Sequence, residues 1–200
     1  MLLKSKKIIL MLILLVSHTT IYAAGFNCKN EDKLSEVERL ICSDKELSKA
    51  DSEMSKNYHS LLNTLPKSEV PILQDDQKLW LKSRNDELDN CLRVGVESAE
   101  CRGLYEYAKR IAQLGPPKEV SFDCEKATQS AEKKICSSRL LRHADGVLAK
   151  LYRGFKDDFK DSQQEWLKER NDALGDSSCD TRCAWEFLKD RIAFFVHQSF

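Results

Sequence analysis

The sequence is poor in residues that interrupt helices and in motifs that carry catalysis. It has only four prolines in 200 residues, all between positions 66 and 117. Strand-like alternation of apolar and polar residues is absent, so helix is favoured almost throughout. No HExxH, GxSxG, P-loop or Rossmann fingerprint occurs, and no two carboxylates stand out as an acid/base pair. We therefore expect an all-α protein that is not an enzyme and needs no cofactor.

Apolar segments long enough to cross a bilayer are also lacking. The apolar run from Ile8 to Val16 is too short for that. Three lysines precede it and Ala23 and Ala24 follow it, the order typical of a secretory signal peptide. We expect residues 1–24 to be this signal, with an uncleaved membrane anchor as the alternative. No cysteine stands in a lipid-attachment context, so the chain is expected to be periplasmic or secreted without a lipid anchor.

An excess of basic charge is missing too. The chain has 32 Lys and Arg and 32 Asp and Glu, and removal of the three signal lysines leaves 29 basic against 32 acidic residues, a net charge of −3. Nucleic-acid binding requires a basic face, so this partner is not expected. The charge gives no reason to expect an anionic membrane as a partner either.

Cysteine, by contrast, is plentiful. Its even number in an exported chain predicts a framework of disulfides. Zinc is the alternative, but no CxxC pair exists and no histidine clusters near Cys179 and Cys183, so no metal site is expected. The eight cysteines all follow the signal: Cys28, Cys42, Cys91, Cys101, Cys124, Cys136, Cys179 and Cys183.

A duplication organises these cysteines. The stretch "WLKSRND" at 80–86 returns as "WLKERND" at 166–172, and "ERLICS" at 38–43 returns as "EKKICS" at 132–137. Each copy carries four cysteines at matching places, and "KRI" at 109–111 matches "DRI" at 190–192. We therefore expect two tandem small helical bundles. The first unit covers residues 25–115, a Pro-containing linker covers 116–121, and a trimmed second unit covers 122–200.

Four helices are expected in each unit. In the first unit they cover roughly 36–42, 44–65, 69–89 and 98–114. "SEVE" at 35–38 and "SDKE" at 43–46 are typical capping boxes, and Ser98 and Asp180 are expected to be N-caps of the fourth helices. Apolar residues at helical spacing form a stripe on the second helix of each unit: Leu47, Ala50, Met54, Tyr58, Leu61 and Leu65, then Leu141, Ala144, Leu148, Tyr152 and Phe155.

The order of helices and cysteines suggests the disulfide pairing. A bridge from the first to the second cysteine of a unit would tie the N-terminal segment to the end of the first helix, and a bridge from the third to the fourth would close the turn between the last two helices. Such bridges stabilise a unit whose own core is small. The predicted pairs are Cys28–Cys42, Cys91–Cys101, Cys124–Cys136 and Cys179–Cys183.

The repeated stretch places its larger side chains on one helical face. Gln77, Trp80 and Arg84 share that face in the first unit, as do Gln163, Trp166 and Arg170 in the second. Each arginine is expected to reach an aspartate on the second helix, Asp51 or Asp145, which is followed seven residues later by Tyr58 or Tyr152. The motif is expected to be a buried structural element. The alternative is an exposed Trp–Arg anchor of the kind found at interface hot spots.

Taken together, these residues resemble a known family. The pattern FxC…E(R/K)xICS…D…Y…Q…WL…RN…C…C…RI is similar to the LprI-type lysozyme-inhibitor domain, over Phe26–Leu114 and, more loosely, Phe122–Phe195. The resemblance implies an exported α-helical bundle with paired cysteines and a role in resisting lysozyme-type muramidases. This chain departs from the pattern in having two copies, in lacking a lipidation cysteine, and in losing part of one turn in the second copy.

Two functions are open from the sequence. The first is inhibition of a lysozyme-type glycoside hydrolase by occlusion of its cleft. The turn "LNTLPKSEVP" at 62–71, with Lys67 and Ser68 at its tip, is the candidate partner-binding element, unless it is a plain solvated turn. The second is a periplasmic binding or scaffold module that uses its two units as two docking faces.

Overall fold

A computed structural model describes residues 27–95, 103–116 and 120–199. These residues form helices and turns and contain no strand, so the predicted all-α class is confirmed. The predicted signal over residues 1–24 lies outside the described residues, as does part of the predicted linker. No helix in the described ranges is long and apolar enough to cross a membrane.

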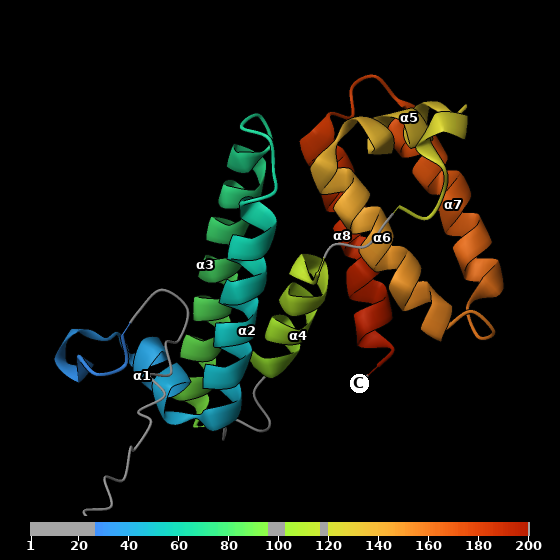
Figure 1. The fold of residues 1–200 in the computed structure, drawn as a ribbon. Coiled ribbons are helices and arrows are strands. Elements are labelled where there is room, and N and C mark those ends of the chain that lie inside the picture. The colour runs from blue at the N-terminus through green and yellow to red at the C-terminus, as the bar shows by residue number, and fades with distance from the viewer. Residues whose placement is uncertain (1–26, 96–102, 117–119, 200) are drawn as a thin grey trace, which may run out of the picture.

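The same order of elements occurs twice along the chain (Figure 1). Within the described residues, each unit has a short 3-10 helix followed by four α-helices. The first unit contains the 3-10 helix Glu31–Lys33, α1 (Glu36–Ser43), α2 (Lys45–Leu62), α3 (Val70–Val94) and α4 (Gly103–Leu114). The second contains the 3-10 helix Cys124–Lys126, α5 (Ser130–Ser137), α6 (Arg139–Gly154), α7 (Lys160–Gly175) and α8 (Thr181–His197).

Side-chain caps explain where several of these helices begin. Ser35 and Glu38 form the predicted capping box at α1, each side chain bonding the backbone N–H of the other residue. The second predicted capping box is wrong. Ser43 ends α1, and α2 is capped instead by Asp44, whose carboxylate accepts from Glu46 N and Leu47 N at 2.9 Å. One ionised aspartate thereby satisfies two free helix N–H groups.

The ends of the long helices also differ from expectation. α2 stops at Leu62 rather than Leu65. α3 continues to Val94, beyond the expected end at residue 89, and is terminated by Gly95 at φ +67°, a left-handed conformation that suits glycine. Asp180 caps α8 as predicted by accepting from Cys183 N at 2.9 Å, whereas Ser98 lies outside the described residues.

Disulfides fasten the short first helices to the segments before them. Cys28–Cys42 and Cys124–Cys136 occupy corresponding places in the two units, and Cys179–Cys183 closes the start of α8. Closing chain loops of 14 and 12 residues stabilises the fold by about 3 kcal/mol each, chiefly by restricting the unfolded chain. The fourth predicted bridge, Cys91–Cys101, involves Cys101, which lies outside the described residues.

The two units share one hydrophobic core. α4 of the first unit packs against α8 and α6 of the second as well as against α2, and it lies between the two bundles (Figure 1). The buried residues of both units form a continuous apolar cluster. The short linker therefore connects two bundles that are docked on each other.

Polar contacts fix the docked arrangement, which we call the junction. Glu69 lies at the N-terminus of α3 but turns its buried carboxylate to α6, where it accepts from Arg139 N at 3.2 Å and Leu140 N at 2.8 Å. Asp76 of α3 bonds Lys189 of α8. His143 Nε2 of α6 bonds the Gln113 carbonyl oxygen of α4 at 2.9 Å.

The junction is expected to weaken in acid because of His143. Burial lowers the pKa of His143, although its bond to the Gln113 carbonyl opposes this effect. Its Nδ1 is buried without a partner among the described residues, so the second proton of an imidazolium would be unsatisfied there. Because the unfolded chain binds this proton more readily, the free energy of unfolding should fall as the pH drops below about 6.5, by at most about 1.4 kcal/mol per pH unit.

Denaturant unfolding between pH 5 and pH 7.5 measures this effect. His143→Gln keeps a donor for the Gln113 carbonyl and should flatten the slope between about pH 5 and pH 6.5. The exposed His59, changed in the same way, serves as the control and should leave the slope in place. A His143→Gln variant with the wild-type slope would show that the buried imidazole is not responsible.

Candidate functional site

The repeated motif forms a buried polar cluster in each unit. We call them cluster one and cluster two. Each combines an aspartate from the second helix, a Gln–Trp–Arg face from the third and an arginine from the fourth. Cluster one contains Asp51, Gln77, Trp80, Arg84, Tyr107 and Arg110, and cluster two contains Asp145, Gln163, Trp166, Arg170, Leu188 and Arg191.

An arginine and a tyrosine share the carboxylate of cluster one. Asp51 is 0% exposed, and its Oδ1 accepts from Arg84 NH1 at 2.9 Å and from the Tyr107 hydroxyl at 2.5 Å. Arg84 NH1 also donates to the Tyr107 hydroxyl oxygen at 3.1 Å. Burial raises the pKa of Tyr107 far above its ordinary value, so this hydroxyl keeps its proton. The three groups form a closed triangle in which the buried charges are paired.

Gln77 makes a second set of bonds in cluster one. Its Oε1 accepts from Arg110 Nε at 2.9 Å and NH2 at 2.7 Å, while its Nε2 donates to the Met54 Sδ at 3.2 Å. Arg110 NH1 bonds Asp76 at 2.6 Å. Both ends of the amide are therefore satisfied, as buried polar groups require.

Each repeated tryptophan lies close to two arginines of its own unit. The guanidinium carbons of Arg84 and Arg110 lie 5.5 and 5.9 Å from the Trp80 ring centroid. Arg170 and Arg191 lie 6.0 and 5.7 Å from the Trp166 ring, which is only 8% exposed. Cation–π attraction to two arginines of its own unit helps to hold each ring against the fold.

The two tyrosines of the motif lie at the edges of their clusters. Tyr58 and Tyr152 are both half-buried. Burial raises the pKa of Tyr58, although the charge of Arg110 opposes the shift. The Tyr152 ring lies 6.0 Å from that of Phe195, so its body packs on the apolar side of the second unit. Neither ring is a free surface group.

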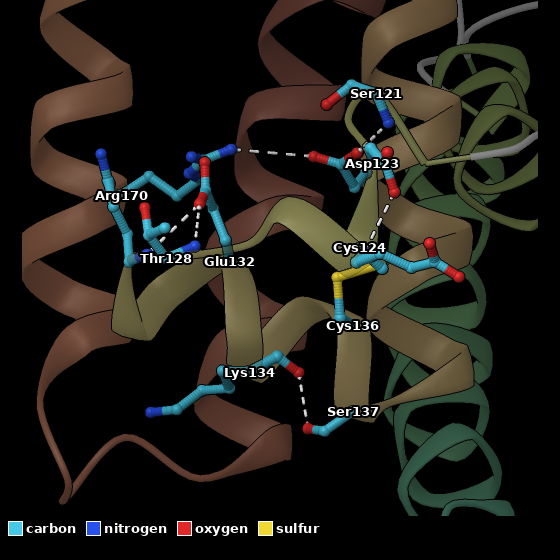
Figure 2. The surroundings of a disulfide bond; sticks show 12 residues. Ser121, Asp123, Cys124, Thr128, Glu132, Lys134, Cys136, Ser137 and Arg170 are labelled. Carbon is cyan, nitrogen blue, oxygen red and sulfur yellow. Dashed lines mark hydrogen bonds and ion pairs between the residues drawn. A yellow bond between two sulfur atoms is a disulfide. The ribbon is translucent and has the colours of Figure 1, made fainter.

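Cluster two is assembled differently from cluster one. Asp145 Oδ2 accepts from the Ser121 backbone N–H at 2.6 Å, while Arg170 NH1 lies 3.7 Å from Asp145 Oδ1. Figure 2 shows Arg170 pointing from α7 toward the segment that carries Ser121, beside the Cys124–Cys136 disulfide. Gln163 Oε1 accepts from Arg191 Nε at 3.1 Å, which corresponds to the Gln77–Arg110 bond. The hydroxyl that closes cluster one has no counterpart, because Leu188 stands where Tyr107 stands.

Sequence reasoning did not identify Tyr107, Arg110 and Arg191 as members of these clusters. The repeated "KRI" and "DRI" stretches that contain the two arginines did mark them. A residue type that recurs at the same place on the fourth helix is a candidate to meet the recurring Gln of the third. Tyr107 gave no such signal, since only one unit has it.

The predicted partner-binding tip lies in the turn between α2 and α3, which we call the junction turn (residues 63–69). Lys67 and Ser68 are exposed there, whereas the next residue, Glu69, is buried against the start of α6. Two exposed arginines on the first turn of α6, Arg139 and Arg142, belong to the same region. The turn is therefore fixed in place by the second unit.

Two similar helical bundles, each stapled by disulfides and built around a corresponding buried cluster, define this chain as a tandem-repeat all-α protein. The model of the family described as "Lysozyme inhibitor LprI" matches residues 28–114 and again residues 124–194. The chain belongs to the LprI lysozyme-inhibitor family. No curated protein and no solved structure matches it. Family membership and the disulfides indicate an extracytoplasmic location.

Proposed function

We propose that the chain is exported through its signal peptide and that residues 25–200 bind and inhibit a lysozyme-type muramidase. The observation that carries this proposal is the family match, which covers both units. An inhibitor of this kind needs no catalytic group, metal or cofactor of its own. It acts by occluding the cleft in which the polysaccharide binds.

The junction turn is the element that suits such a cleft. Glycoside hydrolases of this class hold two carboxyl groups beside the scissile bond, so a cation complements them. Lys67 provides an exposed ammonium group beside the Ser68 hydroxyl, and Arg139 and Arg142 add positive charge from α6. Glu69, which binds the first backbone N–H groups of α6, lowers the conformational freedom that the turn would lose on binding.

A cell-wall lysis assay tests both parts of the proposal. Purified residues 25–200 should slow lysis by a lysozyme-type muramidase, and Lys67→Glu should raise the concentration needed by roughly tenfold, about 1.4 kcal/mol. Lys82→Glu makes the same charge change at an exposed position on α3 and should leave inhibition unchanged.

The outcomes test the junction turn as the binding surface separately from inhibition itself. Equal inhibition by the Lys67→Glu and Lys82→Glu variants would remove the junction turn from the proposal and leave inhibition standing. No slowing of lysis by the wild-type chain, together with no binding to the enzyme, would favour the role of a periplasmic scaffold with two docking units.

A further inference from the structure

A cavity of about 180 Å³ lies beside cluster two, between α6 and α7. Its inner wall is formed by four buried residues of that cluster, and its rim by residues that are exposed or half-buried, so it is reached from solvent. The inner residues are Asp145, Gln163, Trp166 and Arg170. Leu148 forms the apolar side, and the rim is formed by Ser121, Ala149, Tyr152 and Leu167.

Comparison of the two clusters explains why polar groups face this cavity. Asp51, Met54 and Tyr58 correspond by their spacing to Asp145, Leu148 and Tyr152. Met54 provides the sulfur that accepts the amide N–H of Gln77 in cluster one. Its counterpart, Leu148, has no acceptor atom.

The donor on Gln163 is consequently free. Arg191 Nε can only donate, so its bond fixes Oε1 of Gln163 and turns Nε2 the other way. Among the described residues no protein group accepts a hydrogen bond from this Nε2, although the side chain is only 6% exposed. This Nε2 is not closed off from solvent, so the donor is open to the cavity that Gln163 lines.

Arg170 provides a second donor in the same place. Its Nε and NH2 are used by Asn171 at 3.1 and 2.7 Å, and NH1 lies 3.7 Å from Asp145, too far for a hydrogen bond. In cluster one the corresponding NH1 of Arg84 is bonded by both Asp51 and Tyr107. Cluster two has Leu188 where cluster one has Tyr107. Its Arg170–Asp145 ion pair is longer, and an N–H of the Arg170 guanidinium is left available.

We propose that this cavity is a binding site for a small neutral amide, the acetamido group. Its carbonyl oxygen accepts from Gln163 Nε2 and Arg170 NH1, its methyl group packs on Leu148, and its N–H faces the Asp145 carboxylate. Asp145 already balances the charge of Arg170, so a neutral carbonyl suits the site better than a carboxylate. The cavity is smaller than the pockets that hold drug-sized ligands, and it admits one sugar or amino-acid unit.

Acetamido groups occur on N-acetylated sugars and on acylated amino acids, and the test distinguishes these sources. The ¹⁵N-labelled protein, residues 25–200, is titrated separately with N-methylacetamide, N-acetylglucosamine, N-acetylalanine methylamide and, as the ligand lacking the group, glucose. We expect saturable shifts of the Gln163 side-chain amide and Trp166 indole signals with millimolar affinity, in keeping with so few ligand atoms. Glucose should cause none. Tighter binding of N-acetylglucosamine would identify a sugar as the source of the acetamido group, and tighter binding of N-acetylalanine methylamide would identify an acylated amino acid.

Three variants test whether binding depends on the free donor and on the cavity. Leu148→Met supplies the thioether that cluster one uses and should weaken binding roughly tenfold, with little change in core volume. Met54→Leu is the matched exchange in the first unit and should leave binding unchanged. Ala149→Leu fills the rim and should abolish binding even if Leu148→Met disturbs the fold. Shifts that do not saturate would mean that the cavity holds solvent only, and they would overturn the proposal. Full binding by both Leu148→Met and Ala149→Leu would overturn it as well.

Discussion

Replacing Asp76 by alanine is expected to lower the free energy of unfolding by about 3–5 kcal/mol, the cost of leaving buried charges unpaired. The Asp76 side chain is buried on α3 and binds Arg110 of its own unit and Lys189 of the other. Burial raises its pKa, but the charges of Arg110 and Lys189 outweigh that effect and hold the pKa below the usual value. Both cations lose their buried partner in the variant. Denaturant unfolding at neutral pH measures the loss.

The neighbouring aspartate provides the control for this prediction. Asp75 also makes an ion pair across the junction, with Arg182 at 3.0 Å, but both side chains are nearly half exposed. Exposed ion pairs contribute little because water and salt screen them. Asp75→Ala should therefore leave the unfolding midpoint almost unchanged. Equal losses at the two positions would contradict the view that the buried Asp76 group stabilises the docked arrangement.

Replacing either repeated tryptophan by alanine should lower the free energy of unfolding by about 3–5 kcal/mol, because each truncation leaves a cavity beside two arginines. The loss should be greater for Trp166, which is almost fully buried and stacks on Phe187 at 5.7 Å, than for the half-buried Trp80. Thermal or denaturant unfolding of both variants measures the difference. Muramidase binding is measured on the same proteins.

The two interpretations of the motif give opposite results in this experiment. Truncation of a buried structural tryptophan lowers the free energy of unfolding. Truncation of an exposed anchor would leave the melting temperature unchanged and abolish binding. Leu79→Ala is the control, since this neighbour of Trp80 is 65% exposed and its truncation should change stability by less than about 0.5 kcal/mol. Tryptophan variants that melt like this control would contradict the structural role.

Local signals made the helices predictable. Ser35 and Glu38 specify the start of α1 by chemistry contained within four residues, and Asp180 does the same for α8. The apolar stripe of α2 predicted its buried face correctly at Leu47, Met54 and Leu61. Ser43 and Asp44 are neighbours that can both cap a helix. The sequence pattern predicted Ser43 as the cap of α2, whereas the structure has Asp44.

The junction could not be predicted because its partners are far apart in the chain. Glu69 binds the backbone 70 residues away, and Lys189 lies 113 residues beyond Asp76. In the sequence, Glu69 belongs to a polar turn and shows no sign of burial. Nothing in its neighbourhood indicates that α6 will begin beside it.

The duplication made part of the clusters predictable. Arg84 and Asp51 were expected to meet because both recur in the second copy, and they lie 2.9 Å apart. The difference between Tyr107 and Leu188 acquires meaning only when the structure shows which atoms the tyrosine hydroxyl holds together.

Steady-state kinetics of a lysozyme-type muramidase on a soluble oligosaccharide substrate, at increasing concentrations of residues 25–200, test the central claim most directly. Occlusion of the cleft predicts that the apparent KM rises with inhibitor while kcat stays constant, because substrate and inhibitor exclude each other. A fall in kcat at constant KM would place the inhibitor away from the cleft, and unchanged values of both would contradict inhibition altogether.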